Sequence, residues 1–242
     1  MGNCCKNRKS QNEEEKLILS IMHSLIVCEK SFAEIFQLIY KEEYNLQKEG
    51  PSDALKKIKK YEFLELAETH FYNPNELSNP WAKYHKDFFE LISAKLSQNN
   101  ESEIPCSGII FLLLSFLKDH QADKMTFFNY ITSHRIEFDK DNINNIQFIE
   151  VLKEYLRINL SHTTSVMCSI IIKNGQHSDK VDNLEKLRKV FDDQTKLNIY
   201  VDEEFPIKTN GERLETMETL KGNNFIFSFD ELRSSFLSRS SN

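Results

Sequence analysis

The sequence predicts an all-α protein, and three observations support this prediction. Hydrophobic residues make up 40% and charged residues 28% of the 242 residues, which is ordinary for a globular chain. Glycine and proline number only 6 and 5, too few for the many turns of an all-β fold. Apolar residues also recur at the three- and four-residue spacing of helices along much of the chain.

The first apolar stripe predicts a helix within an N-terminal helical region that spans residues 13–78. The stripe consists of Leu17, Ile21, Leu25, Cys28, Phe32, Ile35 and Ile39. Gly50-Pro51 then interrupts the helical pattern. Ser52 or Asp53 is the expected N-cap of a second helix that continues to about His70.

The rest of the chain predicts further helices joined by polar segments. They are expected at about 81–96, 106–118, 123–136, 146–160, 182–192 and 229–238. Residues 161–172 are rich in β-branched side chains, so they fit either a strand or a buried helix. Residues 209–224 are polar and predict a loop or a short helix.

Charge and cysteine usage exclude several classes of protein. The net charge of −6 gives no general attraction to nucleic acid, so no nucleic-acid partner is expected. Cys28, Cys106 and Cys168 are isolated among apolar residues, as expected for buried thiols in a reducing compartment. The chain lacks a glycine-rich phosphate loop, a nucleophile elbow and zinc-spaced Cys/His pairs. We therefore expect a non-enzymatic protein.

The first residues, Met1-Gly2-Asn3-Cys4-Cys5, have the character of an acylation signal. Gly2 presents an amine for myristoylation after removal of Met1, and Cys4 and Cys5 are neighbouring sites for palmitoylation. A basic cluster follows at Lys6, Arg8 and Lys9. One myristoyl chain binds membranes only weakly, so a second chain or a basic patch is needed for stable anchoring. We expect residues 1–12 to form a flexible, acylated tail at the cytoplasmic face of a membrane.

The usual myristoylation pattern has Ser or Thr where this chain has Lys6. The cysteines therefore matter as much as Gly2 for the predicted anchor. An unmodified tail with two incidental cysteines is the alternative.

Residues 139–150 have the spacing of a twelve-residue calcium loop. Such a loop places oxygen ligands at positions 1, 3, 5, 7 and 9 and a bidentate glutamate at position 12. Asp139, Asp141 and Glu150 occupy positions 1, 3 and 12. Asn145 would contribute its backbone carbonyl at position 7, and Gln147 would act at position 9, directly or through water. These five residues are the candidate ligands of a single calcium ion.

Two residues of this loop depart from the calcium-binding pattern. Ile143 provides no side-chain oxygen at position 5, and Asn144 replaces the usual glycine at position 6. The segment therefore fits either a weak calcium site or a loop of the same shape without metal.

Three other segments repeat parts of the same pattern. A loop starting at Ser97 would have Ile104 at position 8 and Gly108 at position 12, and would lack metal. A loop over 192–203 has Asp192 at position 1 and Glu203 at position 12, but Lys196 and Leu197 at positions 5 and 6. A loop over 220–231 ends in Glu231, but its entry half, Leu220-Lys221-Gly222, lacks acidic residues.

With the acylation signal, these loops resemble divergent N-myristoylated calcium sensors of the EF-hand superfamily. The resemblance covers about residues 80–238. It implies paired EF-hand-like helix–loop–helix units with additional N-terminal helices. One pair would span 79–172, and 173–242 would form a degenerate second pair or a helical extension. It also implies a groove that binds a helix of a protein partner.

Two functions remain open at this point. One is a membrane-tethered adaptor or regulator that binds calcium. The other is a constitutive membrane-anchored scaffold that binds protein partners without calcium.

Overall fold

A computed structural model shows a mostly helical protein, which confirms the predicted all-α class. It describes residues 13–45, 51, 53, 55–72, 80–97, 102–132, 145–175, 178–205 and 224–240. Its α-helices are α1 (Glu13–His23), α2 (Phe32–Tyr40), α3 (Lys60–His70), α4 (Ala82–Leu96), α5 (Cys106–Leu114), α6 (Gln121–Thr132), α7 (Asn145–Arg157), α8 (Thr163–Asn174), α9 (Val181–Asp192), α10 (Gln194–Glu204) and α12 (Phe229–Ser240). Short helical turns are η1 (Ile26–Glu29), η3 (Ile158–His162), η4 (Ser178–Lys180) and η5 (Asn224–Phe227), and the strands are β1 (Lys57–Lys59) and β2 (Glu103–Pro105).

The N-terminal apolar stripe is buried as predicted, but it belongs to three short elements instead of one long helix. Helix α1 ends at His23, the turn η1 follows, and α2 begins after Ser31. Ser31 and Glu34 form a capping box, in which the Glu34 carboxylate accepts the Ser31 amide at 2.7 Å. This cap starts a new helix within the apolar stripe. The stripe therefore indicates correctly that these apolar side chains pack into the core, but the single continuous helix that it predicts does not form.

The lysine-rich segment before α3 is a strand, which corrects the prediction of a helix starting at Ser52 or Asp53. Ser52 lies outside the described residues, and the Asp53 carboxylate accepts the amide of Leu55 at 3.2 Å in a turn. Helix α3 begins only at Lys60. Strand β1 precedes it and alternates exposed Lys57 and Lys59 with buried Ile58, as one strand of a half-buried ribbon does.

Strands β1 and β2 form an antiparallel ribbon in which Ile58 lies opposite Ile104. Each strand leads directly into a helix, β1 into α3 and β2 into α5. The ribbon thus joins two helix–strand–helix units, α2–β1–α3 and α4–β2–α5, whose helices also contact one another. It connects the predicted N-terminal region (13–78) with the region in which a loop pair was expected (79–172).

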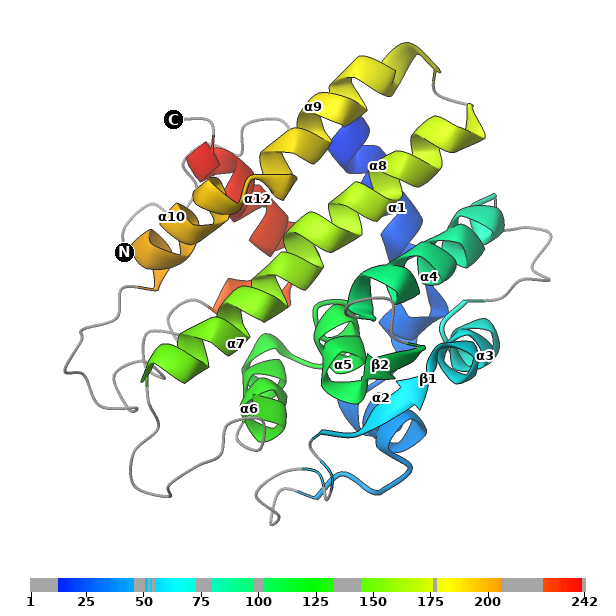
Figure 1. Cartoon of the computed structure of the whole chain (residues 1–242), viewed down its shortest axis with the longest axis vertical. Coiled ribbons are helices and arrows are strands. Elements are labelled where there is room, and N and C mark those ends of the chain that lie inside the picture. Colours follow the sequence, from blue (N-terminus) through cyan, green and yellow to red (C-terminus); the bar gives the residue numbers. More distant parts are fainter. Residues whose placement is uncertain are drawn as a thin grey trace.

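The elements α7, η3 and α8 form one continuous rod from Asn145 to Asn174 (Figure 1). Segment 161–172, which fitted either a strand or a helix, is therefore helical. The π-helical turn η3 interrupts the regular α-helical hydrogen bonding in the middle of the rod. There the buried Asn159 side chain donates to the carbonyls of Phe111 (2.8 Å) and Tyr155 (3.0 Å). The rod ends at Gly175, whose φ of 68° gives the left-handed C-cap.

Helix α10 was not expected from the sequence. Asp193 caps it by accepting the amides of Thr195 (3.0 Å) and Lys196 (3.2 Å). Residues 194–204 are therefore helical, and the loop suggested over 192–203 does not form. Most of the polar segment 209–224 lies outside the described residues.

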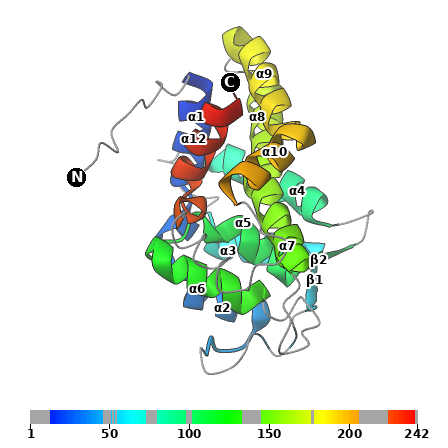
Figure 2. The same cartoon turned by 90° about the vertical axis from the view of Figure 1, so that its left-hand side faces the viewer.

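The first and last described helices are joined by a buried ion pair. Arg233 Nε donates to Glu15 Oε1, and Arg233 Nη2 donates to Glu15 Oε2 at 2.8 Å. Both side chains are fully buried. Arg233 Nη1 also donates to Thr164 Oγ1 at 2.6 Å. The guanidinium lies 4.4 Å from the ring centroid of Phe191 and 5.0 Å from that of Phe229. Helix α1 is thereby fixed to α12 and α8, and Figure 2 shows α1 beside α12.

We expect Arg233→Leu to lower the free energy of unfolding by about 3–5 kcal/mol, because it leaves the buried Glu15 charge without a partner. Urea unfolding followed by circular dichroism measures this loss. The double variant Glu15→Leu/Arg233→Leu should recover much of it, since no isolated charge remains.

The pair of Arg239 with Glu204 is the matched control, because Arg239 is 54% exposed. Arg239→Leu should cost less than about 1 kcal/mol. An Arg233→Leu cost no larger than that of Arg239→Leu would contradict the importance of the buried pair.

Candidate functional site

The predicted calcium ligands lie partly outside the described residues. Asp139 and Asp141 belong to the segment that the structure does not describe. Asn145, Gln147 and Glu150 lie in the first turns of α7, which begins at the residue expected to occupy position 7 of the loop. The Glu150 side chain is 68% exposed, and its carboxylate lies 3.8 Å from the Lys153 ammonium.

Across the ranges that the structure describes, no cluster of three or more His, Cys, Asp or Glu side chains is placed to hold a metal ion. The acylation residues Gly2, Cys4 and Cys5 also lie outside these ranges, which begin at Glu13. Within the same ranges, no helix combines the length and apolar character needed to cross a bilayer.

The expected loop at Ser97 does contain a strand, but the partner of that strand differs from the one expected. Ile104 pairs with Ile58 of β1, whereas the sequence suggested the 139–150 loop as its partner. Across the ribbon, the Lys59 ammonium forms an ion pair with the Glu103 carboxylate, and this hydrogen bond holds the pKa of Glu103 below its usual value. The ribbon is therefore closed by a lysine–glutamate contact on its exposed face.

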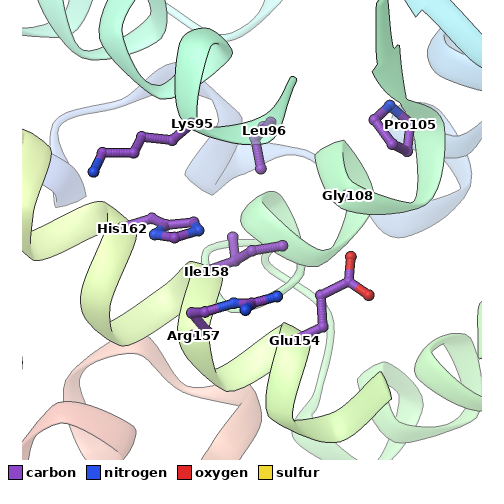
Figure 3. A pocket seen from close by; sticks show the side chains of 8 residues that line it. All are labelled: Lys95, Leu96, Pro105, Gly108, Glu154, Arg157, Ile158 and His162. Atoms are coloured by element: carbon purple, nitrogen blue, oxygen red, sulfur yellow. The ribbon is translucent and has the colours of Figure 1, made fainter. Parts of the chain in front are cut away.

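A cavity of about 300 Å³ lies between the end of α4, the start of α5 and the rod formed by α7 and η3 (Figure 3). Three basic side chains line it: Lys95 from α4, Arg157 from α7 and His162 from η3. Glu154 of α7 and Gly108, in the first turn of α5, lie on its other side. The lining is completed by Leu96, Pro105 and Ile158.

His162 is held neutral by its surroundings. Burial, together with the positive charges of Lys95 and Arg157, lowers its pKa from the ordinary 6.5 to about 4, although the Asp192 carboxylate acts in the opposite direction. At neutral pH the imidazole is therefore an uncharged hydrogen-bonding group between two cations. The Lys95 and Arg157 side chains are themselves exposed to solvent.

Sequence reasoning did not find this cavity. Its residues come from five elements, α4, β2, α5, α7 and η3, and no motif connects Lys95 with Arg157 or His162. The histidines looked scattered, because only the folding of α4 against α8 brings His162 near Lys95. One local feature marks the cavity, the π-helical turn η3. Such turns are frequent at functional sites, but the spacing of apolar residues does not reveal them.

We expect His162→Gln to reduce the acid sensitivity of the fold. Between pH 6.5 and 4 the unfolded chain binds a proton at His162 and the folded chain does not, so stability falls as the pH is lowered through this range. Urea unfolding at pH 7 and pH 4.5 should show a smaller difference for His162→Gln than for the wild type. His120→Gln, at an exposed position, should leave the difference unchanged, and an equal effect of both variants would refute the assignment.

The chain matches no protein-family model, no curated protein and no solved structure.

Proposed function

We propose that the protein is a non-enzymatic adaptor, tethered to the cytoplasmic face of a membrane and built on an EF-hand-like module that works without calcium. The single observation that carries this proposal is the antiparallel pairing of Ile58 with Ile104 between two helix–strand–helix units. In the EF-hand superfamily, paired loops meet at the apolar residue of position 8. With Ile58 and Ile104 at that position, the paired loops are 51–62 and 97–108.

The residues at the ligand positions of these two loops favour a role without calcium. The first loop has Leu55 at position 5 and Lys59 at position 9, where a cation needs oxygen ligands. Its position 12 is Glu62, but that carboxylate accepts the Lys59 amide at 3.3 Å and so caps α3. The second loop has Pro105 at position 9 and Gly108 at position 12, which provide no side-chain oxygen.

The exposed apolar side chains next to this module support an adaptor role. Leu55 and Tyr61, on either side of β1, are 76% and 67% exposed. Contiguous apolar surface kept in solvent is typical of sites that contact a partner, and we propose that Leu55 and Tyr61 belong to such a surface. We place the contact with a protein partner here, in place of the groove implied by the family resemblance.

The membrane tether is proposed from the first residues of the sequence. Gly2 supplies the amine for one acyl chain, and Cys4 and Cys5 supply two thiols for others. Two or three chains together hold a protein on a membrane far longer than one does.

A calcium-binding adaptor is the second candidate, because Asp139, Asp141 and Glu150 keep the spacing of positions 1, 3 and 12. Calorimetric titration of the full chain, purified without acylation, decides between the two candidates. We expect no heat of binding up to about 1 mM calcium, the weak limit of such sites. A calcium response that is present in the wild type and absent in Glu150→Gln would overturn the calcium-independent proposal.

For the tether, we expect the wild-type protein in the membrane fraction of cells and most of Gly2→Ala in the soluble fraction, because its remaining signals are too weak alone. Cys4→Ser/Cys5→Ser should shift in the same direction, and Cys28→Ser, in the folded core region, is the matched control. Unchanged membrane association of both tail variants would remove the tether from the proposal.

A further inference from the structure

We propose that Cys28 is a site of reversible modification by small-molecule disulfides, with His23 and Asp230 as the residues that prepare its thiol for the reaction. The inference does not depend on the proposed adaptor role. It rests on the contacts that join these three side chains, on the exposure of the Cys28 thiol and on the positive charge beside it.

The three side chains come from segments far apart in the sequence. His23 is the last residue of α1, Cys28 lies in the turn η1, and Asp230 lies in the first turn of α12. Because α1 lies beside α12 (Figure 2), His23 Nε2 is 2.5 Å from Asp230 Oδ1. A side-chain hydrogen bond joins the same imidazole to Cys28. Cys28 Sγ also donates to the Met22 carbonyl at 3.6 Å, which places the sulfur at the end of α1.

The imidazole between the thiol and the carboxylate is a cation at neutral pH. The hydrogen bond with Asp230, followed by that with Cys28, raises the pKa of His23 from the ordinary 6.5 to about 10, although burial acts in the opposite direction. A cation beside a thiol favours the thiolate, which is the form of cysteine that attacks a disulfide. Asp230 thus acts through His23, because it keeps the proton on the imidazole and the charge next to the sulfur.

A second cation belongs to the same region. Lys124 of α6 is 5% exposed, and its ammonium donates to the carbonyls of Ser115 (3.4 Å) and Phe227 (3.2 Å). Burial lowers the pKa of Lys124 to about 8, whereas the negative charges of Asp119 and Cys28 act in the opposite direction. The charge of a Cys28 thiolate and that of the Lys124 ammonium therefore attract each other.

Solvent reaches Cys28 but not the other described cysteines. The sequence predicted burial for all three, yet Cys28 is partly exposed, whereas Cys106 and Cys168 are buried. Burial raises the pKa of these two thiols to about 12, so they stay protonated and inert. Among the cysteines that the structure describes, Cys28 is therefore the one that a reagent in solution can attack.

The proposed reaction is a thiol–disulfide exchange, and glutathione disulfide is the probe for it. The Cys28 thiolate attacks one sulfur of glutathione disulfide, so a bond forms between Cys28 and one glutathione while the original sulfur–sulfur bond breaks. The Cys28 sulfur is oxidised and the departing glutathione sulfur is reduced. The departing thiolate takes up the proton that the Cys28 thiol released. Excess reduced glutathione reverses the exchange, so the site responds to the thiol–disulfide balance around it.

The test uses the full-length, unacylated protein with Cys4→Ser and Cys5→Ser, so that the thiols of the first residues do not react. The protein is incubated with glutathione disulfide, and its proteolytic peptides are measured by mass spectrometry. We expect one glutathione on Cys28 and none on Cys106 or Cys168. Excess reduced glutathione should remove it.

Variants distinguish a prepared thiol from one that is only accessible. Alkylation of Cys28 by iodoacetamide at neutral pH should be about tenfold slower in His23→Gln, because the adjacent cation is lost. Asp230→Asn should also slow it. Loss of folding would expose the thiol and raise the rate, so a slower reaction cannot result from unfolding. Glu13→Gln removes the exposed contact of α1 with Lys180, and as the matched control it should leave the rate unchanged.

His23→Arg keeps a cation that can pair with Asp230, and it should retain most of the wild-type alkylation rate. Equal rates in the wild type and His23→Gln, or a loss in His23→Arg as large as that in His23→Gln, would overturn the role of the imidazole as the adjacent cation. Absence of a glutathione adduct on Cys28, or an equal amount on Cys106 and Cys168 of the folded protein, would overturn the proposed modification.

Discussion

The ion pair between Glu15 and Arg233 holds the two ends of the described chain in one core. Neither charge is exposed to solvent, so each depends on the other for its stabilisation. The pair places α1 against the rod and against α12. His23 with Asp230 adds a second contact between α1 and α12, and Glu13 with Lys180 joins α1 to η4. The proposed acylated tail therefore precedes a helix whose position is set by a buried charge, and a tether on that tail would hold the folded core directly.

Helices were predictable wherever burial of an apolar face alone determines the structure. The spacing of apolar residues anticipates α4, α7, α9 and α12 closely, because each of these helices buries one stripe against the core. Prediction failed where pairing with a segment distant in sequence determines the local structure. Residues Lys57–Lys59 form a strand because they pair with Glu103–Pro105. The local sequence around the lysines contains no information about that partner.

The candidate sites also divide into features that the local sequence predicts and features that depend on a partner distant in sequence. Ile104 was predicted at the position where one loop pairs with another, and it does lie in a strand. A β-branched residue favours a strand, and this preference can be read from the local sequence. Its partner Ile58 was missed, because the lysines around it resemble a solvated helix face. The cavity could not be predicted at all. Its chemistry arises only when the end of α4 and the π-helical turn of the rod approach each other.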